Sequence, residues 1–383
     1  MKKLNNRLVN TEFSGIAKVI KSADSIGDSV IHLEVGDIDL ETSPAVLDGI
    51  HNALANKKLH YPELRGNREL LKMIVEKLSV EGIQISQDQL LVTAGGSMGM
   101  YIAFQTIANP GDEILIFEPV WPHLVQMITL SGATPIRIAL SEETDFHIRT
   151  SDLENLVTPK TKAIVINTPN NPTGVVYATE EMKELCLFAQ KHDLVIISDE
   201  EYNNFTYGNN NVVSPAKFYS NVIISRSFSK TLAASGLRLG YMVFPKGWED
   251  TVSKMSLYSS MYPPSISQSA VLESLKINDK YPGLLRGIFA ERMLFVTESL
   301  NSVKGISCRQ PEGAVYVWIK LENYASDEIE LCDRLLKEAK VAVVPGSCFG
   351  AAGHGYARLS LGQDITILKD AVERIRVFFD NLE

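Results

Sequence analysis

Between residues 89 and 244, short and nearly continuous apolar runs alternate with segments in which apolar residues recur every three or four positions. The runs lie at residues 89–95, 109–119, 162–167, 194–200, 221–225 and 239–244. Residues 97–108 and 179–193 between them have helical periodicity. Strands that are apolar on both faces and separated by helices are typical of a mainly parallel sheet with helices on both sides. The pattern therefore predicts an α/β fold.

The pattern changes from about residue 265. A long helical segment, residues 266–303, is followed by a strand pair at 305–321, a helix at 327–340, a short strand at 341–346 and an amphipathic helix at 365–383. This succession predicts a smaller α+β domain. We therefore expect an N-terminal segment at 1–40 that contributes to the small domain, a large domain at 41–270 and the small domain at 271–383. The boundary is predicted to lie inside the long helix.

Composition narrows the range of partners. The chain has 383 residues, of which 45% are hydrophobic and 22% charged, as expected for a globular protein with a large core. Its net charge of −9 argues against a nucleic-acid partner. No run is long enough to span a bilayer, and the N-terminus does not have the pattern of a signal peptide.

The four cysteines are scattered along the chain, without C-x-x-C spacing. Such cysteines are typical of reduced thiols in a cytoplasmic protein, so we expect a cytoplasmic location and no membrane partner. His, Cys and carboxylate residues do not form a convincing cluster either, and no metal site is expected.

Polar residues follow the apolar runs, where the carboxyl ends of parallel strands bind ligands. Gly96 and Ser97 come directly before a predicted helix, whose N-terminus can bind an anion such as phosphate, although a glycine pair is more often only a tight turn. Trp121 can be a flat surface on which a ring stacks, or it can simply be a residue of the core. Asn171 lies in the turn-rich stretch "TPNNPTG", where its amide can face the same crevice.

A carboxylate and a lysine follow two further runs. Asp199 ends the run "LVIIS", where a buried carboxylate needs a cationic partner; a helix N-cap is the alternative. Tyr202 is three residues further on. Ser227 and Lys230 follow the run at 221–225, in "SFSK". A lysine is usually on a solvated face, but one beside a core strand can have a lowered pKa and act as a nucleophile.

Together these groups complement one cofactor. Gly96, Ser97, Ser227 and Arg238 form a potential anion site, and Trp121 supplies an aromatic face. The carboxylate, amide, phenol and amine described above match a ring nitrogen, a ring hydroxyl and an aldehyde. Pyridoxal 5′-phosphate carries all of these groups, with the phosphate.

The motifs "NNPTG", "SDEEY" and "SFSK…GLRLGY" occur in this order between residues 170 and 241. In their order and spacing the chain resembles the fold-type I PLP-dependent class I/II aminotransferases, the aspartate-aminotransferase-like group. The resemblance extends from "LEVGDID" near residue 33 to "ARLSLG" near residue 358. It implies the PLP-dependent transferase type I fold with a mostly seven-stranded sheet.

The resemblance implies a role for each motif residue. Lys230 forms the Schiff base with the cofactor (the internal aldimine) and moves the proton between Cα and C4′. Asp199 keeps the pyridinium nitrogen protonated, Tyr202 and Asn171 bond the phenolate oxygen, and Trp121 stacks on the ring. The phosphate is held by Gly96, Ser97 and Met98 through the backbone, and by Ser227 and Arg238.

Three further residues are implied by the resemblance. Tyr61 in "HYPELRG" reaches the phosphate of the neighbouring subunit, which implies a homodimer; its alternative is a half-buried aromatic. Arg358 in "ARLSLG" binds the substrate α-carboxylate as a bidentate partner, although by itself it reads as a surface salt bridge. Gly36 belongs to the N-terminal segment that closes over the substrate. Asn171 is also among the residues that bind the substrate.

Some positions depart from the family pattern. Ile38 replaces a frequent proline, Met98 replaces a polar or aromatic residue, and "VWPHL" lacks a second aromatic residue. Arg7 and Arg65 are unsupported candidates for binding a second substrate carboxylate. His123, Met98 and "YSSMYPPS" suggest a mostly uncharged pocket, so neutral or aromatic amino acids are the expected substrates.

The expected reaction is that of a transaminase (EC 2.6.1), which passes the amino group of an L-amino acid to a 2-oxo acid in a ping-pong sequence. Fold alone does not determine the chemistry. A C–S β-lyase or an amino-acid decarboxylase is the alternative, and racemases and substitution-catalysing synthases are further ones. A non-enzymatic ligand sensor would be expected to carry an attached DNA-binding region, for which the chain offers no room.

Overall fold

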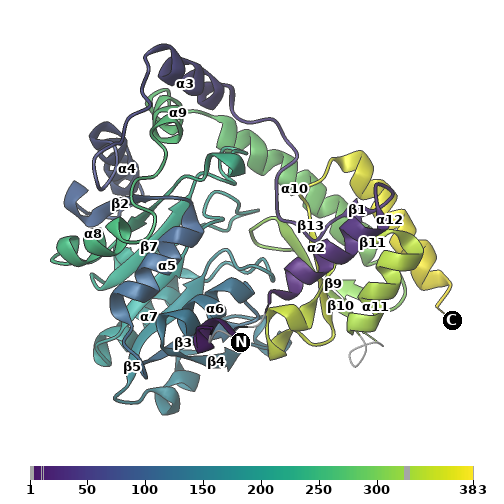
Figure 1. Ribbon diagram of the computed structural model, residues 1–383. Coiled ribbons are helices and arrows are strands. Elements are labelled where there is room, and N and C mark those ends of the chain that lie inside the picture. Colours follow the sequence, from purple (N-terminus) through teal and green to yellow (C-terminus); the bar gives the residue numbers. More distant parts are fainter. Residues whose placement is uncertain (1–3, 10, 12, 323–327, 383) are drawn as a thin grey trace.

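The central sheet has seven strands, six of which run in the same direction (Figure 1). Its order is β2-β8-β7-β6-β5-β3-β4, and β8 is antiparallel to both of its neighbours. The strands are β2 (Leu90–Thr93), β3 (Glu113–Glu118), β4 (Thr134–Ala139), β5 (Thr161–Asn167), β6 (Val195–Asp199), β7 (Val222–Ser227) and β8 (Gly240–Val243). The computed structural model describes residues 4–9, 11, 13–322 and 328–382. The predicted α/β fold with a mainly parallel sheet is confirmed.

The edge strand β4 is absent from the predicted runs. It pairs with β3 alone, and most of its side chains are exposed or half-buried. Pro135 and Arg137 interrupt its apolar sequence, as an edge position allows because one side of the strand has no neighbour. The strand therefore lacks the continuous apolar run that identifies the buried strands.

Helices cover both faces of this sheet because alternate strand residues point in opposite directions. On β3, Leu115 and Phe117 belong to one apolar core, whereas Ile114 and Ile116 belong to another. The first core is closed by α4 (Arg68–Val80), α7 (Thr179–Lys191) and α9 (Ser265–Lys276), and the second by α5 (Gly96–Ile107), α6 (Pro122–Ser131) and α8 (Glu249–Leu257). The strands are apolar on both faces for this reason.

The prediction of one long helix at 266–303 is wrong, because the structure has two helices there. Helix α9 ends at Lys276, and α10 (Tyr281–Leu300) begins after a short connection. Asn278 in this connection has φ of 49°, a left-handed conformation that a right-handed helix cannot contain. Pro282 lies in the first turn of α10, where its missing N–H costs nothing. Helical periodicity continues across the break, which is why the sequence reads as one helix.

A second, antiparallel sheet lies beside the first. Its order is β12-β13-β10-β9, formed by β9 (Ile306–Cys308), β10 (Tyr316–Leu321), β12 (Val344–Pro345) and β13 (Tyr356–Ser360). The helices around it are α10, α11 (Glu328–Arg334), which continues as a π-helical turn (Leu335–Ala339), and α12 (Ile365–Asp380). Residues 327 and 383, at the ends of two predicted helices, lie outside the described residues.

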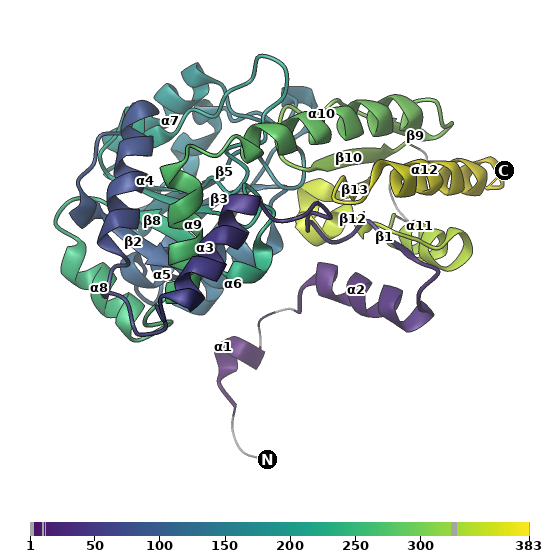
Figure 2. The ribbon, with the colours of Figure 1, turned by 90° about the horizontal axis from the view of Figure 1, so that it is seen from above.

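The N-terminal segment packs against this second sheet region. Strand β1 (Ile31–His32) pairs in parallel with β11 (Val341–Ala342), and α2 (Gly15–Ile26) lies alongside (Figure 2). Helix α1 (Asn6–Val9) stands apart from α2, near α6, while α3 (Pro44–Ala55) packs against α9. After α1, the chain therefore runs along the smaller region through α2 and β1, and it enters the larger region again at α3.

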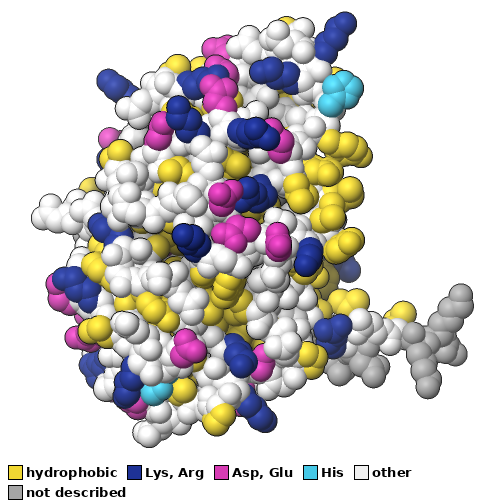
Figure 3. Space-filling model, turned by 90° about the vertical axis from the view of Figure 1, so that its left-hand side faces the viewer, with side chains coloured by type: hydrophobic (Ala, Val, Ile, Leu, Met, Phe, Trp, Pro, Cys, Tyr) yellow, Lys and Arg dark blue, Asp and Glu magenta, His cyan; other side chains and the backbone are white. Residues whose placement is uncertain are grey.

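Short 3₁₀ helices complete the fold at Gln87–Gln89, Glu142–Thr144, Thr150–Leu156, Pro215–Lys217, Ser235–Leu237, Gly346–Phe349 and Ala351–Gly353. None of the helices in the described part of the chain has the length and apolar character to cross a membrane. On the face shown in Figure 3, charges of both signs are interspersed, and hydrophobic side chains gather along one edge.

Candidate active site

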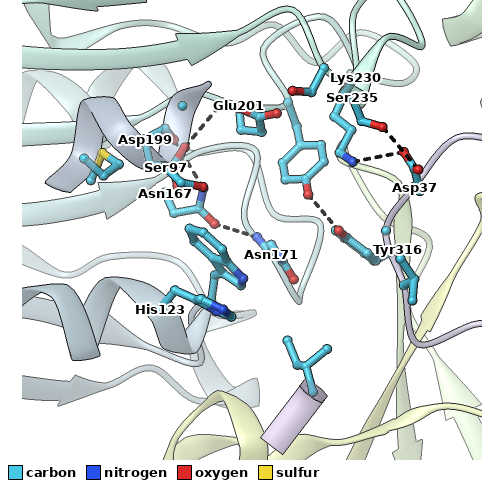
Figure 4. Close-up of a pocket in the computed structure, with 18 of the residues that line it drawn as sticks. Asp37, Ser97, His123, Asn167, Asn171, Asp199, Glu201, Lys230, Ser235 and Tyr316 are labelled. Atoms are coloured by element: carbon cyan, nitrogen blue, oxygen red, sulfur yellow. Dashed lines mark hydrogen bonds and ion pairs between the residues drawn. The ribbon is translucent and has the colours of Figure 1, made fainter. Parts of the chain in front are cut away.

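A cavity of about 330 Å³ opens at the carboxyl ends of the parallel strands, between the two sheet regions (Figure 4). Its walls come from the N-terminal segment, from the ends of β5 and β6, from the starts of α5 and α6, from the loop after β7 and from the second sheet. They include Ile16, Ile20, Glu34, Val35, Gly36, Asp37, Gly96, Ser97, Met100, Trp121, His123, Asn167, Asn171, Asp199, Glu201, Tyr202, Ser229, Lys230, Ser235, Arg238, Tyr316 and Arg358.

Lys230 faces this cavity rather than bulk solvent. Its side chain is 15% exposed, and its Nζ lies 3.8 Å from Asp37 Oδ1 of the N-terminal segment. Asp37 Oδ2 also accepts a hydrogen bond from Ser235 Oγ over 3.2 Å (Figure 4). The lysine after the core strand therefore lies in an enclosed site where an amine can react with a bound carbonyl group.

Asp199 is the last residue of β6 and is buried, and none of the ion pairs between described residues includes it. Its Oδ1 accepts a hydrogen bond from Glu201 N over 3.2 Å. Burial, with a smaller contribution from Glu201, raises the pKa of Asp199 to about 8. The alternative role as a helix N-cap is wrong, because turns rather than a helix follow β6.

A series of hydrogen bonds connects Arg358 with the end of β6. Arg358 Nη1 donates to Asn171 Oδ1 over 2.9 Å, and Asn171 N donates to Asn167 Oδ1 over 2.7 Å. Asn167 Nδ2 in turn donates to the Asp199 carbonyl over 3.3 Å. Residues from the second sheet and from the central sheet are thus held together at one end of the cavity.

Arg358 is 2% exposed and belongs to β13. Its guanidinium lies over the rings of Tyr316 and Phe349, at 4.2 and 4.9 Å from their centroids, and Nη2 donates to the Glu34 carbonyl. No carboxylate in the described part of the chain forms an ion pair with it, and its Nε has no partner there. The alternative reading as a surface salt bridge is therefore wrong, and the buried cation suits an anionic ligand.

Tyr202 and Trp121 supply aromatic surfaces. The hydroxyl groups of Tyr202 and Tyr316 are 2.7 Å apart, and their rings meet edge to face. Trp121 precedes α6 and stacks on His123 with ring centroids 4.4 Å apart. Burial lowers the pKa of His123, so an uncharged imidazole extends this aromatic wall.

The predicted anion site lies at the start of α5. Gly96 and Ser97 line the cavity, as does Arg238, whose side chain approaches the backbone of Gly95. Ser227 is buried beside them, and its Oγ donates to Glu201 Oε1 over 2.6 Å. The side chain of Met98 is different: it packs against the core between the sheet and α5, α6 and α8.

Of the remaining predicted residues, Gly36 lies in the cavity wall, whereas Tyr61, Arg65 and Arg7 lie outside it. Gly36 lines the cavity, and a Cβ at this position would lie 1.9 Å from Tyr316 Oη, so the close approach requires glycine. Tyr61 is 82% exposed, lies outside the cavity of its own chain and has its ring 5.1 Å from that of Tyr262. Arg65 pairs with Asp88, and Arg7 contacts the Leu130 carbonyl; neither lines the cavity.

Comparison with known proteins identifies the family. Residues 28–375 match the family described as aminotransferase class I and II. The chain is 33% identical to an aspartate aminotransferase of Thermotoga maritima, over 93% of both chains, and 31% identical to aromatic-amino-acid aminotransferase 2 of Thermococcus litoralis, over 97% of both. Its fold matches that of the Thermus thermophilus aspartate aminotransferase with maleate at a TM-score of 0.94 and 31% identity, covering 99% of this chain and 100% of that one. The chain belongs to the class I and II aminotransferases.

This aminotransferase is therefore a PLP-dependent transaminase with the type I fold, as the motifs predict. The relatives reported above all have aminotransferase names, which does not favour the lyase or decarboxylase alternative.

The cavity of the aminotransferase fits pyridoxal 5′-phosphate by its chemistry. Asp199 is a buried carboxylate without a cationic partner among the described residues, and a protonated ring nitrogen would stabilise its charge. A Cβ on Gly96 would lie 2.7 Å from Glu201 Oε2, so the start of α5 is open only because this residue is glycine. Asp199, Lys230, Arg238 and the start of α5 can hold the cofactor.

Sequence reasoning did not single out several residues of the cavity wall, namely Ile16, Ile20, Glu34, Asp37, Asn167, Glu201, Ser235 and Tyr316. Glu201 had a signal, because it lies inside the motif "SDEEY" between two predicted site residues. Asp37 is next to Gly36 in the same way. Tyr316 had none, since its contact with Tyr202 spans 114 residues and depends on how the second sheet docks.

Proposed function

We propose that this aminotransferase carries out its reaction in the cavity between the two sheets, with Lys230 as the residue that carries the cofactor. The observation that supports the proposal is that Lys230, Asp199 and Arg358 line one cavity although they come from three different elements. An amine, a buried acid and a buried cation that has no carboxylate partner among the described residues match the reactive aldehyde, the ring nitrogen and the carboxylate of an amino-acid substrate.

When bound, pyridoxal 5′-phosphate supplies the carbonyl group that takes up the amino group and the ring that withdraws electrons. Lys230 Nζ, which faces the cavity, would accept the proton from the substrate Cα and deliver it to the cofactor carbon C4′. Asp199 stabilises a positive charge at the ring nitrogen. Tyr202 and Asn171, which line the cavity, would hold the ring oxygen by donating hydrogen bonds, and Trp121 would pack on the ring face.

Arg358 binds the α-carboxylate of the amino acid and of the 2-oxo acid. The guanidinium retains donor capacity, because its bonds to Asn171 Oδ1 and to the Glu34 carbonyl leave Nε free. Its position over two aromatic rings keeps the planar group oriented. Gly36 and Asn171 border the same place, so the substrate backbone lies between the N-terminal segment and the β5 turn.

The phosphate is bound by Gly96, Ser97 and Met98 through backbone groups and by Ser227 and Arg238. The N-terminus of α5 favours an anion by its N–H groups and dipole. Met98 takes part through its backbone only, because its side chain packs in the core.

Tyr61 completes this phosphate site in a neighbouring copy of the chain, so the enzyme is a homodimer. Its 82% exposure supports this role, since no described contact buries the ring in one chain. Exposed apolar side chains are found at Leu59, close to Tyr61 in sequence, and at Tyr258 and Met261, close to Tyr262, whose ring meets that of Tyr61; they offer an apolar contact surface.

The division into domains and the cellular location belong to the same proposal. The division into a segment at 1–40, a large domain at 41–270 and a small domain at 271–383 is supported by the pairing of β1 with β11 and by two apolar clusters, one drawn mostly from residues 41–270 and the other mostly from residues 271–383. A cytoplasmic location is supported by the four cysteines, all of them free.

The amino donor has a neutral or aromatic side chain. Within the described chain, three cationic side chains line the cavity, and Lys230, Arg238 and Arg358 all have roles above. Among the described residues of the cavity wall, no further cationic side chain remains for a second carboxylate, whereas Ile16, Ile20, Trp121 and the uncharged His123 form an apolar and aromatic wall. Several relatives are named aspartate aminotransferases, so the side chain is where this enzyme is proposed to differ.

The test is to mix the PLP-loaded enzyme with single L-amino acids and to identify the products by mass spectrometry. Phenylalanine, leucine and aspartate are compared; we expect phenylalanine or leucine to give its 2-oxo acid and the amino form of the cofactor. Release of carbon dioxide, or of ammonia with pyruvate, would contradict transamination. A tenfold preference for aspartate would contradict only the proposed substrate class and would leave transamination as the reaction. Lys230→Ala should bind the cofactor without a borohydride-reducible covalent link.

A further inference from the structure

Glu201 is a carboxylate of the cavity that the mechanism does not use. It lies between Asp199 and Tyr202 in sequence, but its side chain turns toward the end of β7 and the start of α5. Its Oε1 accepts the 2.6 Å hydrogen bond from Ser227 Oγ, and Oε2 lies 2.7 Å from the place of a Cβ on Gly96. The carboxylate thus lies between two groups that are proposed to bind the cofactor phosphate.

The charges around Glu201 come from three elements. From the loop after β7, Lys230 and Arg238 attract its negative charge. From its own segment, Asp199 is repelled by it, while the carboxylate of Glu200 is paired with Arg226 at 2.8 Å. From α5, the backbone of Gly96 lies beside it, and the first turn of that helix has no acidic residue. Ser227, Arg238 and the helix N-terminus therefore surround an anion that belongs to the chain itself.

A carboxylate and a phosphate have the same requirements, namely N–H or O–H donors and nearby positive charge. Two anions in one partly enclosed site repel each other strongly, because water screens them poorly there. The hydrogen bond of Ser227 Oγ also has a single proton, which it cannot give to both acceptors at once. Occupation of the site by one group therefore weakens binding of the other.

We propose that Glu201 competes with the phosphate group of the cofactor for Ser227, Arg238 and the start of α5, so that the enzyme binds and retains its cofactor less tightly than it would with a neutral side chain at this position. The inference rests on the assignment of these groups to the phosphate in the proposed function. It adds a determinant of cofactor exchange that lies inside the cofactor site.

Protonation offers one way to relieve the competition. Burial raises the pKa of Glu201, although the bond from Ser227 and the charges of Lys230 and Arg238 oppose the shift. A protonated Glu201 no longer repels phosphate and can donate a hydrogen bond to it. Phosphate-dependent binding should therefore weaken as the pH rises and Glu201 becomes charged.

The test compares the full chain with its Glu201→Gln variant, which keeps the shape and removes the charge. The cofactor is first removed, and three probes are titrated at pH 8 and pH 6 by calorimetry: pyridoxal 5′-phosphate, inorganic phosphate and pyridoxal, which has no phosphate. We expect Glu201→Gln to bind the first two roughly tenfold more tightly or better at pH 8, with a smaller gain at pH 6, and to bind pyridoxal unchanged.

Asp37→Asn is the matched control, because Asp37 is also a cavity carboxylate but contacts Lys230 and Ser235 instead of Ser227. It should leave the affinity for inorganic phosphate unchanged. Equal affinities of the wild-type chain and Glu201→Gln for both phosphate-bearing probes would overturn the inference, and so would an equal gain for pyridoxal. Failure of the proposed cofactor site is a separate result: it would appear as loss of pyridoxal 5′-phosphate binding in every chain, while inorganic phosphate still reports on Glu201.

Discussion

Arg358 Nη1 and Asn171 Oδ1 are joined by a hydrogen bond of 2.9 Å, although 187 residues separate them. Arg358 belongs to the second sheet and Asn171 to the turn that follows β5 of the central sheet. The bond orients the guanidinium toward the cavity, and it uses an amide rather than a carboxylate as partner. Arg358 therefore keeps its charge available to a ligand.

The first prediction concerns Arg358→Lys. The lysine retains the charge but cannot form two parallel hydrogen bonds with a carboxylate, so we expect KM for the amino acid and for the 2-oxo acid to rise roughly 30- to 100-fold. The affinity for the cofactor should change little, because Arg358 is not assigned to it. Steady-state kinetics and a cofactor titration measure the two effects.

Arg309→Lys is the control for this substitution, since Arg309 is about half exposed and pairs with Asp145 outside the cavity. Its kinetics should match those of the wild-type enzyme. An unaltered KM in Arg358→Lys would show that another group binds the carboxylate.

The second prediction concerns the pH dependence of stability with the cofactor removed. The pKa of Asp199 is raised by burial from 3.8 to about 8, so between these values the folded chain holds a proton that the unfolded chain has released. This contribution to stability is complete below about pH 4 and is lost as the pH rises through 8, by at most about 1.4 kcal/mol per pH unit. Asp199→Asn has no such proton.

We therefore expect the free energy of unfolding of Asp199→Asn to gain on that of the wild-type chain from pH 5 to pH 8, as measured by urea denaturation. The exposed Asp152→Asn variant should follow the wild-type curve throughout. Parallel curves for Asp199→Asn and the wild-type chain would mean that Asp199 is ionised at pH 5 already.

The third prediction tests whether Tyr61 acts across a dimer. Tyr61→Ala and Lys230→Ala chains are each expected to be nearly inactive, and they are co-expressed to form mixed dimers. If Tyr61 serves the neighbouring site, one site of each mixed dimer has both residues, and about a quarter of the wild-type activity should return. If mixed dimers form, as native mass spectrometry would report, but no activity returns, the proposed sharing is wrong.

The fourth prediction concerns His147, which joins three segments outside the cavity. Its Nδ1 lies 2.8 Å from Glu181 Oε2 at the start of α7, and its Nε2 lies 3.7 Å from Glu312 Oε1. The hydrogen bond with Glu181, followed by that with Glu312, raises the pKa of His147 from 6.5 to about 9. Its stabilising charge is therefore fully present below pH 6.5 and is lost between 6.5 and 9.

His147→Gln should lower the free energy of unfolding by about 1 to 3 kcal/mol at pH 6 and by much less at pH 9.5. The exposed His51→Gln variant serves as control and should have no effect at either pH. An equal loss at both pH values would mean that His147 contributes by packing and not by its charge.

Much of the fold follows from local sequence patterns. The apolar runs at 113–118, 162–167 and 195–198 have to be buried on both faces, and the helices between them require parallel strands. An edge strand and a helix break are harder to recognise. Strand β4 is half exposed, and the left-handed residue Asn278 interrupts a pattern that remains periodic on both sides.

The sequence by itself determined which chemical groups follow the strands, because Asp199, Asn171 and Lys230 come directly after apolar runs whose carboxyl ends share one edge of the sheet. Only the tertiary structure decided which partners these groups meet. That Arg358 has an amide and no described carboxylate as its partner, and that Glu201 turns toward Ser227, depends on how distant segments dock. Residue order along a strand is local, whereas side-chain partners and burial arise from packing across the whole chain.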